Sequence, residues 1–358
     1  LFVRKPLDVV TEYRLRDDSA ALEMVTWYQG RDAVSVVSPG PGDLIFWGDT
    51  LEYVFPGHGR SAPAQVTSVL GLAHDVAYGW FADAQTTAVD LPGFDLPAVP
   101  LTAENAVIAP GETVVNRRWF VVGAGGAEVM ARFTGRFPEH PAASEQSFLS
   151  SVVVVRAGER VAGATVELRA PEGQAGSAEP GYPSYSDANG VATVFAPAGD
   201  YTVHVSGPQG TAAQLDATVS EGQEVLVELA PLGTLTLQVQ HALGEQQVGS
   251  PARVRLTHQE TQQTRLWLVK RGEHVGALVP GTWNYEISRG SEYSYHAGQV
   301  EIEAGSSTQL DVLIEHVVPT PGFISGEFHQ HSSASLDSEV SVEDRVLGNL
   351  VEGVDFAV

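Results

Sequence analysis

The sequence predicts a mainly β protein made of several sandwich-like domains, with one short α/β segment near the C-terminal end. Three observations predict this fold class. Gly (37) and Pro (21) recur along the chain and separate short segments rich in Val, Thr, Tyr and Leu. Several of these segments alternate apolar and polar side chains, the period that places one face of a strand on a core. Helical periodicity is found only near the C-terminal end.

Length and charge limit the organisation and the partners. At roughly 100–200 residues per domain, 358 residues predict several domains. The chain has 20 Lys and Arg against 44 Asp and Glu, a formal charge of −24. Such a surface repels nucleic acid and anionic lipid, so no nucleic-acid partner is expected. The longest apolar run, around 148–155, is far shorter than the about 18 residues of a membrane helix, so no membrane-spanning segment is predicted. Cysteine is absent, which excludes disulfides and thiolate chemistry.

Three breaks rich in proline, glycine or polar residues divide the chain: Pro138–Glu145, Pro231–Gly233 and Val318–Gly322. The predicted domains are 1–137, 148–230, 233–317 and 321–358.

The first segment is predicted to be a β-sandwich of its own. In the strand predicted at Val9–Arg16, the side chains of Val9, Tyr13 and Leu15 share the face expected to lie on the core.

Tryptophans are concentrated in the first segment. Trp27, Trp47 and Trp119 are expected to be at least half buried, because aromatic residues at strand spacing usually belong to a core. The alternative is a carbohydrate-binding role. The loop Phe55–Arg60 contains Pro-Gly-x-Gly beside aromatic residues and can form the rim of a sugar site.

The second and third segments form a degenerate repeat. Pro197 and Pro280 are 83 residues apart, and so are Gly222 and Gly305. This is an ordinary size for one small β-sandwich, so two related sandwiches in tandem are predicted. Strands that carry Tyr201 and Tyr285 are expected at equivalent positions.

The first copy of the repeat has the clearer turn signals. Asn189-Gly190 predicts a tight hairpin, because these residues best tolerate positive φ. The nearby Asp187 is expected to stabilise the turn and not to bind calcium, because calcium needs six or more oxygen ligands and this turn offers few. With Gly163–Leu168 and Pro197–Tyr201, this copy resembles the carboxypeptidase-regulatory-like or transthyretin-like sandwich. The second copy lacks the Asn-Gly turn.

The candidate chemistry lies in the last segment. Apolar residues lead up to His329, and His331 follows two residues later, so both imidazoles point to the same side of an extended chain. Two converging imidazoles can bind a divalent metal: zinc, manganese or iron. Asp337, in the following loop, can add an oxygen ligand.

A helix and a second strand are predicted after this loop. Ser341 is the expected N-cap, with Asp344 at the third helical position. Gly353 is the expected stop, and Val354–Val358 is the next strand. The apolar stripe expected to pack consists of Val342, Val346, Leu347, Leu350 and Val351. Strand, loop, helix and strand make a βαβ unit, which places ligands at strand carboxyl ends.

Residues 326–358 resemble the opening motif of the PHP (polymerase and histidinol phosphatase) superfamily, whose metal-binding barrel begins with a strand ending in His-x-His. The resemblance implies that His329 and His331 are metal ligands, with Asp337 where a further ligand often stands. Glu327 replaces an Asp that is frequent two positions before the first His.

The rest of the chain carries a narrower resemblance. Gly42–Gly48, Phe55–Gly59 and Pro110–Glu112 are similar to short motifs of the mutarotase-like supersandwich that precedes small sandwiches and a PHP barrel in CehA/McbA-type metallohydrolases. This implies a supersandwich at 1–137 and the first βαβ unit of a truncated PHP (β/α) barrel at 321–358.

The family's next motif, Thr-Asp-His, is expected just beyond Val358. The chain is therefore interpreted as a piece of a longer protein, with the catalytic base and remaining ligands outside it, and as almost inactive alone.

Three functions remain open. One is a metal-dependent hydrolase of a small-molecule ester or phosphoester. The second is a surface or scaffold protein, and the third is a carbohydrate-binding module. A secreted, periplasmic or cell-surface location is suspected, although this sequence contains no signal segment.

Overall fold

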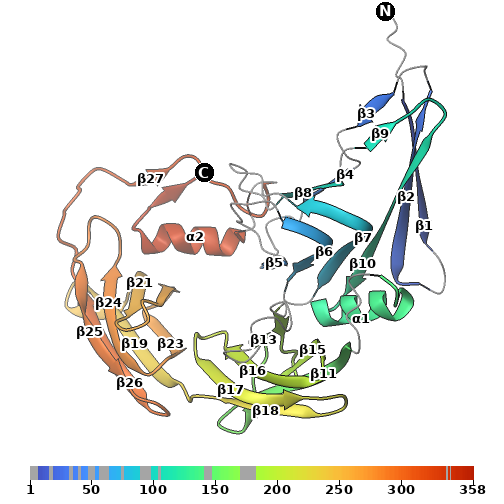
Figure 1. Ribbon diagram of the computed structural model, residues 1–358. Coiled ribbons are helices and arrows are strands. Elements are labelled where there is room, and N and C mark those ends of the chain that lie inside the picture. Colours follow the sequence, from blue (N-terminus) through green and yellow to red (C-terminus); the bar gives the residue numbers. More distant parts are fainter. Residues whose placement is uncertain are drawn as a thin grey trace, which may run out of the picture. The chain divides into compact units, whose positions relative to one another are not determined.

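The computed structural model describes residues 7–15, 19–31, 35–38, 42–46, 53–55, 64–73, 76–88, 98–103, 106–140, 147–169, 183–335, 338 and 340–358. These residues confirm a mainly β protein with several sandwich-like sheets, and they include two helices (Figure 1). The chain divides into two compact units. One is Leu1–Pro208 with Ala212–Leu229, and the other is Gln209–Thr211 with Ala230–Val358.

An eight-stranded antiparallel sheet dominates the N-terminal part of the first unit. Its main path is, in order, β1 (Leu7–Leu15), β2 (Ala21–Gly30), β10 (Thr113–Gly123), β7 (Ala77–Ala88), β6 (Ala64–Leu72) and β5 (Tyr53–Phe55). Strand β8 (Ala98–Ala103) pairs with both β7 and β4 (Gly42–Phe46). A separate two-stranded sheet contains β3 (Val36–Ser38) and β9 (Ala106–Ile108).

Helix α1 (Gly126–Arg136) packs on one face of this sheet and is not among the elements predicted from the sequence. Its N-cap, Gly125, makes no side-chain cap hydrogen bond. The helix is stabilised instead by burial of one face: Phe133 stacks on Phe81 with ring centroids 3.7 Å apart, and Val129 is fully buried. Tertiary packing therefore outweighs a weak local helix signal.

Two expectations for the first segment need correction. Strand β1 is present, but Val9, Tyr13 and Leu15 are exposed, because α1 packs on β6, β7 and β10 and not on this edge strand. The predicted linker at Pro138–Glu145 begins too early, since His140 is only 7% exposed and its Nε2 lies 2.6 Å from the carbonyl oxygen of Ala82.

The expected burial of tryptophan is confirmed where it can be checked. Trp119 is buried and Trp27 is more than half buried. Trp47 and most of the Phe55–Arg60 loop lie outside the described residues.

Asp43, in the segment Gly42–Gly48, links β4 to β7 and β10 through its side chain. Its carboxylate accepts a hydrogen bond from Trp80 Nε1 at 3.0 Å and lies 3.3 Å from the buried guanidinium of Arg118. Arg118 also donates to Thr26 Oγ1 at 2.7 Å.

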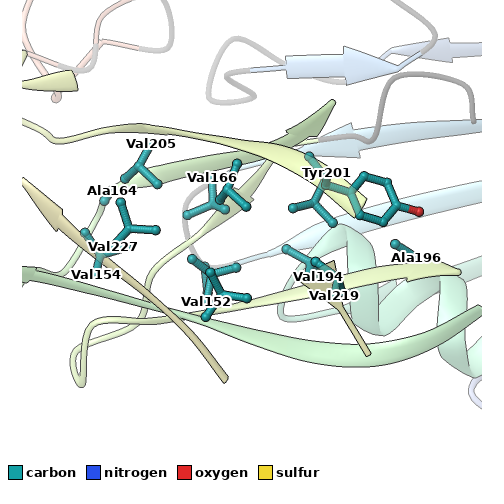
Figure 2. Close-up of a cluster of buried hydrophobic side chains, with 14 of the residues drawn as sticks. Val152, Val154, Ala164, Val166, Val194, Ala196, Tyr201, Val205, Val219 and Val227 are labelled. Atoms are coloured by element: carbon teal, nitrogen blue, oxygen red, sulfur yellow. The ribbon is translucent and has the colours of Figure 1, made fainter. Parts of the chain in front are cut away.

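The first small sandwich contains two four-stranded sheets. One is formed by β12 (Glu159–Arg160), β11 (Ser147–Arg156), β15 (Val191–Pro197) and β18 (Glu224–Leu229). The other runs β14 (Ser184–Tyr185), β13 (Thr165–Arg169), β16 (Gly199–Ser206), β17 (Ala212–Val219). Val152 and Val194 from one sheet meet Val166 and Tyr201 from the other in the core (Figure 2).

The second small sandwich repeats this topology strand for strand. One sheet contains β20 (Gln246–Gly249), β19 (Gly233–Leu243), β23 (Glu273–Leu278) and β26 (Ser307–Ile314). The other runs β22 (Thr264–Val269), β21 (Ala252–His258), β24 (Gly281–Ser288), β25 (His296–Ile302). In both copies the first strand also pairs in parallel with the last.

Strands β16 and β24, which carry Tyr201 and Tyr285, are equivalent, but the residue that matches Tyr201 is Trp283. Each follows the first glycine of its strand by two positions and is buried. Tyr201 Oη donates to the carbonyl of Pro197 at 3.2 Å, and Trp283 Nε1 donates to that of Val279 at 2.8 Å. The same contact is therefore made by two different aromatic residues.

The remaining elements are β27 (Gly326–Glu327), α2 (Val342–Val351) and β28 (Phe356–Ala357). Strands β27 and β28 pair in parallel, with α2 as the connection. This is the βαβ order that the sequence predicts.

Candidate metal site

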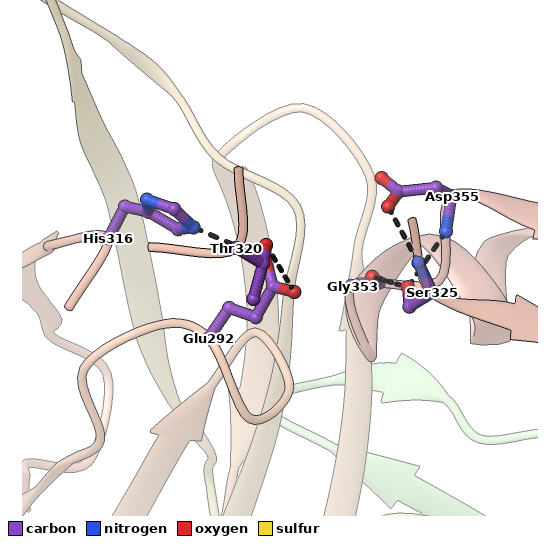
Figure 3. Close-up of polar contacts among 6 residues, drawn as sticks. All are labelled: Glu292, His316, Thr320, Ser325, Gly353 and Asp355. Carbon is purple, nitrogen blue, oxygen red and sulfur yellow. Dashed lines mark hydrogen bonds and ion pairs between the residues drawn. The ribbon is translucent and has the colours of Figure 1, made fainter. Parts of the chain in front are cut away.

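The segment that enters the βαβ unit is fastened to the second sandwich by Glu292. Its carboxylate accepts from Thr320 Oγ1 at 3.0 Å and lies 3.2 Å from Nε2 of His316 (Figure 3). Its backbone carbonyl accepts from the N–H groups of Val317 and Val318. The first residues of the predicted break at 318–322 are therefore bound to the second sandwich by hydrogen bonds to Glu292.

Ser325 and Asp355 fix the starts of the two parallel strands. Ser325 donates from Oγ to the carbonyl of Gly353 at 2.6 Å and from its backbone N to Asp355 Oδ2 at 3.0 Å (Figure 3). Asp355 N donates back to Ser325 Oγ at 3.1 Å. These bonds fix how β27 is aligned with β28, and therefore where the histidines after β27 lie.

Helix α2 has the predicted ends. Ser341 Oγ accepts from the backbone N of Asp344 at 3.0 Å, and Gly353 adopts the left-handed φ of +70° after the last turn. Two ion pairs join the helix to the second sandwich. Lys270 Nζ lies 2.5 Å from Glu343, and Arg253 Nη1 lies 2.9 Å from Glu352.

The apolar stripe predicted for α2 is mostly unburied. Val351 is fully buried, whereas Val342, Val346 and Leu350 are exposed. The helix docks through the face that carries Glu343, Leu347 and Val351, four residues apart. The periodicity was correct for a helix, but it could not select which of two adjoining apolar faces makes contact.

The two histidines converge. Nε2 of His329 lies 2.9 Å from Nε2 of His331, and the ring centroids are 5.0 Å apart at an interplanar angle of 33°. One ring donates and the other accepts, since a neutral imidazole has one donor and one acceptor nitrogen. The two-residue spacing predicts this common side. Backbone N of His329 donates to Glu327 Oε1 at 2.9 Å, which fixes the carboxylate beside the chain.

Side chains from α2 hold the histidine loop, and they are not among the site residues predicted from the sequence. Arg345 Nε donates to the carbonyl of His331 at 2.9 Å. Gln330 and Asn349 exchange two amide hydrogen bonds, of 2.7 and 3.0 Å. Arg345 and Asn349 are four residues apart and therefore share one helix face, which is the signal that could have identified them.

The chemistry of this pair fits a divalent metal. Imidazole nitrogens are borderline ligands that suit zinc, manganese or iron. A tetrahedral ion about 2.0–2.1 Å from each nitrogen needs them only a few tenths of an ångström farther apart than they are. Asp337, the third predicted ligand, lies outside the described residues. Within the described part of the chain, no cluster of three or more His, Asp or Glu side chains has the arrangement of a metal site.

Asp187 has the turn role that the sequence favours. Its Oδ1 accepts from the backbone N of Asn189 at 2.8 Å and of Val191 at 2.9 Å. The bond from Val191 lowers the pKa of Asp187 more than any other contact does.

Comparisons with known proteins give no family. No protein-family model matches the chain, and no curated protein is significantly similar to it. Among solved structures, the minor pilin GBS52 of Streptococcus agalactiae is 13% identical, with a TM-score of 0.27 over 49% of this chain and 99% of that one. The shaft pilin SpaA of Lactobacillus rhamnosus GG is also 13% identical, with a TM-score of 0.30 over 49% and 99%.

A third structure, the Bacillus anthracis TIE protein, is 13% identical, with a TM-score of 0.22 over 90% of this chain and 59% of that one. TM-scores this low establish no common fold. Neither helix in the described part of the chain is long and apolar enough to cross a bilayer.

Proposed function

We propose that this chain is part of a divalent-metal-dependent hydrolase of ester or phosphoester bonds, with His329 and His331 among its metal ligands. The observation that carries the proposal is the 2.9 Å approach of the two Nε2 atoms immediately after the first strand of a βαβ unit. In α/β folds with parallel strands, ligands and metals bind at this end of the strand.

Each residue around the pair has a defined part in this proposal. His329 and His331 present their Nε2 atoms to the metal. Arg345 fixes the backbone of His331, and Asn349 fixes the intervening Gln330. Asp337 is a proposed oxygen ligand. A bound zinc or manganese ion, with iron as the alternative, supplies Lewis-acid polarisation of the scissile bond and activates water.

The finer architecture belongs to the same proposal. Residues 1–137 would be a mutarotase-like supersandwich, and 321–358 the start of a PHP barrel of the CehA/McbA type. The support is the set of short motifs, the tandem sandwiches and the βαβ unit with its His-x-His. A secreted, periplasmic or cell-surface location is part of this proposal.

Metal content tests the proposal directly. The chain is purified after exposure to zinc or manganese, and bound metal is measured by mass spectrometry for wild type and for a His329→Ala/His331→Ala variant. We expect the double variant to lose the metal. His204→Ala, a histidine of the first sandwich, is the matched control and should keep wild-type content. Equal metal in all three proteins would remove His329 and His331 from the site.

A further inference from the structure

A cavity of about 540 Å³ opens on the N-terminal sheet. Its described lining comes from the hairpin end of β1 and β2, from β7 and β10, and from residues 136–140, which are the last residue of α1 and the four that follow it. All of these belong to one compact unit, and none is part of the histidine loop. The volume lies in the range of cavities that accept small molecules.

The sheet register puts the polar wall of the cavity in one row. Arg14 pairs with Glu23 across β1 and β2, and Glu23 pairs with Trp119 across β2 and β10. Glu23 is only 13% exposed and lies 3.3 Å from Arg117 Nε and 3.9 Å from Arg14 Nη1. Glu23 thus lies beside two guanidinium groups of the lining, and the Arg14 group is held more closely by Glu12, whose Oε2 accepts from Nη2 at 2.7 Å.

Trp119, at the end of this row, begins the apolar part of the lining, which is fixed. Trp119 packs against Phe137 with ring centroids 4.9 Å apart, and His140 meets the indole edge-on at 5.7 Å. His140 is tied to the backbone of Ala82. Such a wall loses little freedom when a ligand binds, which favours affinity.

The charges of the lining are balanced. The lining contains three arginines, Arg14, Arg117 and Arg136, and three carboxylates, Glu23, Asp83 and Glu139. An anionic ligand meets three carboxylates here, and a cationic ligand meets three guanidinium groups, so either is disfavoured. A neutral ligand whose groups both donate and accept hydrogen bonds can use both kinds of side chain at once. Hydroxyl groups have this property.

We propose that this cavity binds a neutral saccharide of one or two rings, with hydroxyl groups on the Arg and carboxylate wall and the apolar ring face toward Phe137 and Trp119. Aromatic side chains next to hydrogen-bonding groups are suited to a ligand with one polar and one apolar side. The site is independent of the proposed hydrolase function. It also differs from the Phe55–Arg60 loop that the sequence indicated as a sugar-binding rim.

Saturation-transfer NMR on the full chain tests this assignment. The probes are D-glucose, D-galactose and N-acetyl-D-glucosamine, with D-glucuronate and inorganic phosphate as charged counterparts, each titrated to about 20 mM. We expect saturable binding of at least one neutral sugar. Arg117→Gln and Asp83→Asn, both at exposed positions of the lining, should weaken it about fivefold or more.

Arg132→Gln is the matched control. Arg132 is an exposed arginine of α1 paired with Glu128, outside the lining, and its replacement should leave sugar binding unchanged. Circular dichroism melts verify that every variant is folded. The assignment is overturned if no neutral sugar binds, if a charged probe binds more tightly than every neutral one, or if both lining variants bind like wild type.

Discussion

His140 shows how a single buried side chain ties a connecting segment to a core. It is 7% exposed, donates to the Ala82 carbonyl from Nε2, and meets Phe133 edge-on at 4.8 Å. Burial lowers the pKa of His140, and this effect exceeds the opposing influence of the Ala82 carbonyl and the Asp83 charge. The imidazole is therefore neutral in the folded protein at neutral pH.

A pH dependence of stability follows from this lowered pKa. In the unfolded chain His140 titrates near its ordinary value of about 6.5, so below that pH the unfolded state binds a proton that the folded state does not. Stability is full above about pH 6.5 and falls as the pH drops toward the lowered folded value. We expect the Tm of wild type to fall more between about pH 7 and 5 than that of His140→Gln, which keeps a donor but does not titrate. Parallel profiles for the two proteins would contradict this.

At the residue scale, the sequence could predict only those parts of the site that depend on local geometry. The spacing of His329 and His331 placed both rings on one side, because extended chain alternates. The contact of Arg345 with His331 depends on how α2 docks, which no local pattern contains. The exchange of Tyr201 for Trp283 was likewise hidden, because the equivalence is set by strand register and not by residue type.

At the scale of elements, helix α2 is the support of the histidine loop. It is fixed to the second sandwich by the Lys270–Glu343 and Arg253–Glu352 pairs, and it holds the loop through Arg345 and Asn349. The loop is thus positioned by the sandwich through the helix.

Removing the Arg345 contact should loosen the loop without unfolding the helix. We expect Arg345→Ala to raise amide hydrogen exchange in a peptide that covers residues 326–335 by about threefold or more, with partial recovery in Arg345→Lys. Val346→Ala, on the exposed face of the same helix, is the control and should exchange like wild type. Unchanged exchange in Arg345→Ala would show that this hydrogen bond does not order the loop.

The hairpin at Gly190 provides a second test at this scale. Gly190 and Gly222 both have positive φ, of +69° and +74°. A Cβ at Gly190 would lie 2.8 Å from the carbonyl oxygen of Val154, whereas nothing lies within 4 Å of one at Gly222. We expect Gly222→Ala to lower the free energy of unfolding by about 1 kcal/mol and Gly190→Ala by about 3 kcal/mol or more, measured by urea unfolding. Equal losses would show that backbone φ alone decides the cost.

A strand, turn or helix could be predicted where neighbouring residues in the sequence determine it, and not where distant contacts do. Alternation identified β1 as a strand, and the Asn-Gly dipeptide identified the turn at Gly190. Its counterpart in the second sandwich, Gly272, also has positive φ, and a Cβ there would lie 2.5 Å from the carbonyl oxygen of Val239. Because no Asn precedes Gly272, this turn has no Asn-Gly signal in the sequence. Helix α1 was missed because its stability comes from Phe133 and Val129 packing on the sheet.

At the scale of the whole molecule, the repeat of 83 residues was the most informative pattern. It predicted two copies of one topology, and both sandwiches have the same strand order around separate cores. Composition does not show which distant strands pair, but a sequence repeat indicates that two segments share one fold.

The ligand count leads to a prediction for the chain as a catalyst. The ligand set proposed above, His329, His331 and Asp337, is smaller than the set that a hydrolytic metal commonly uses together with a positioned base. Assayed with zinc or manganese against a generic ester or phosphodiester, the 358-residue chain is expected to show almost no turnover. Robust turnover that His329→Ala abolishes would instead show that these residues complete a working site.

The parallel pairing of first and last strands has a mechanical consequence. In the first sandwich β11 lies beside β18 over Ser151–Arg156, and in the second β19 lies beside β26 over Thr234–His241. Tension applied along the chain pulls these neighbouring strands in opposite directions along their length. The backbone hydrogen bonds between the two strands are then loaded in shear at the same time, and they do not break one after another. Each sandwich therefore resists stretching through the hydrogen bonds between its own first and last strands.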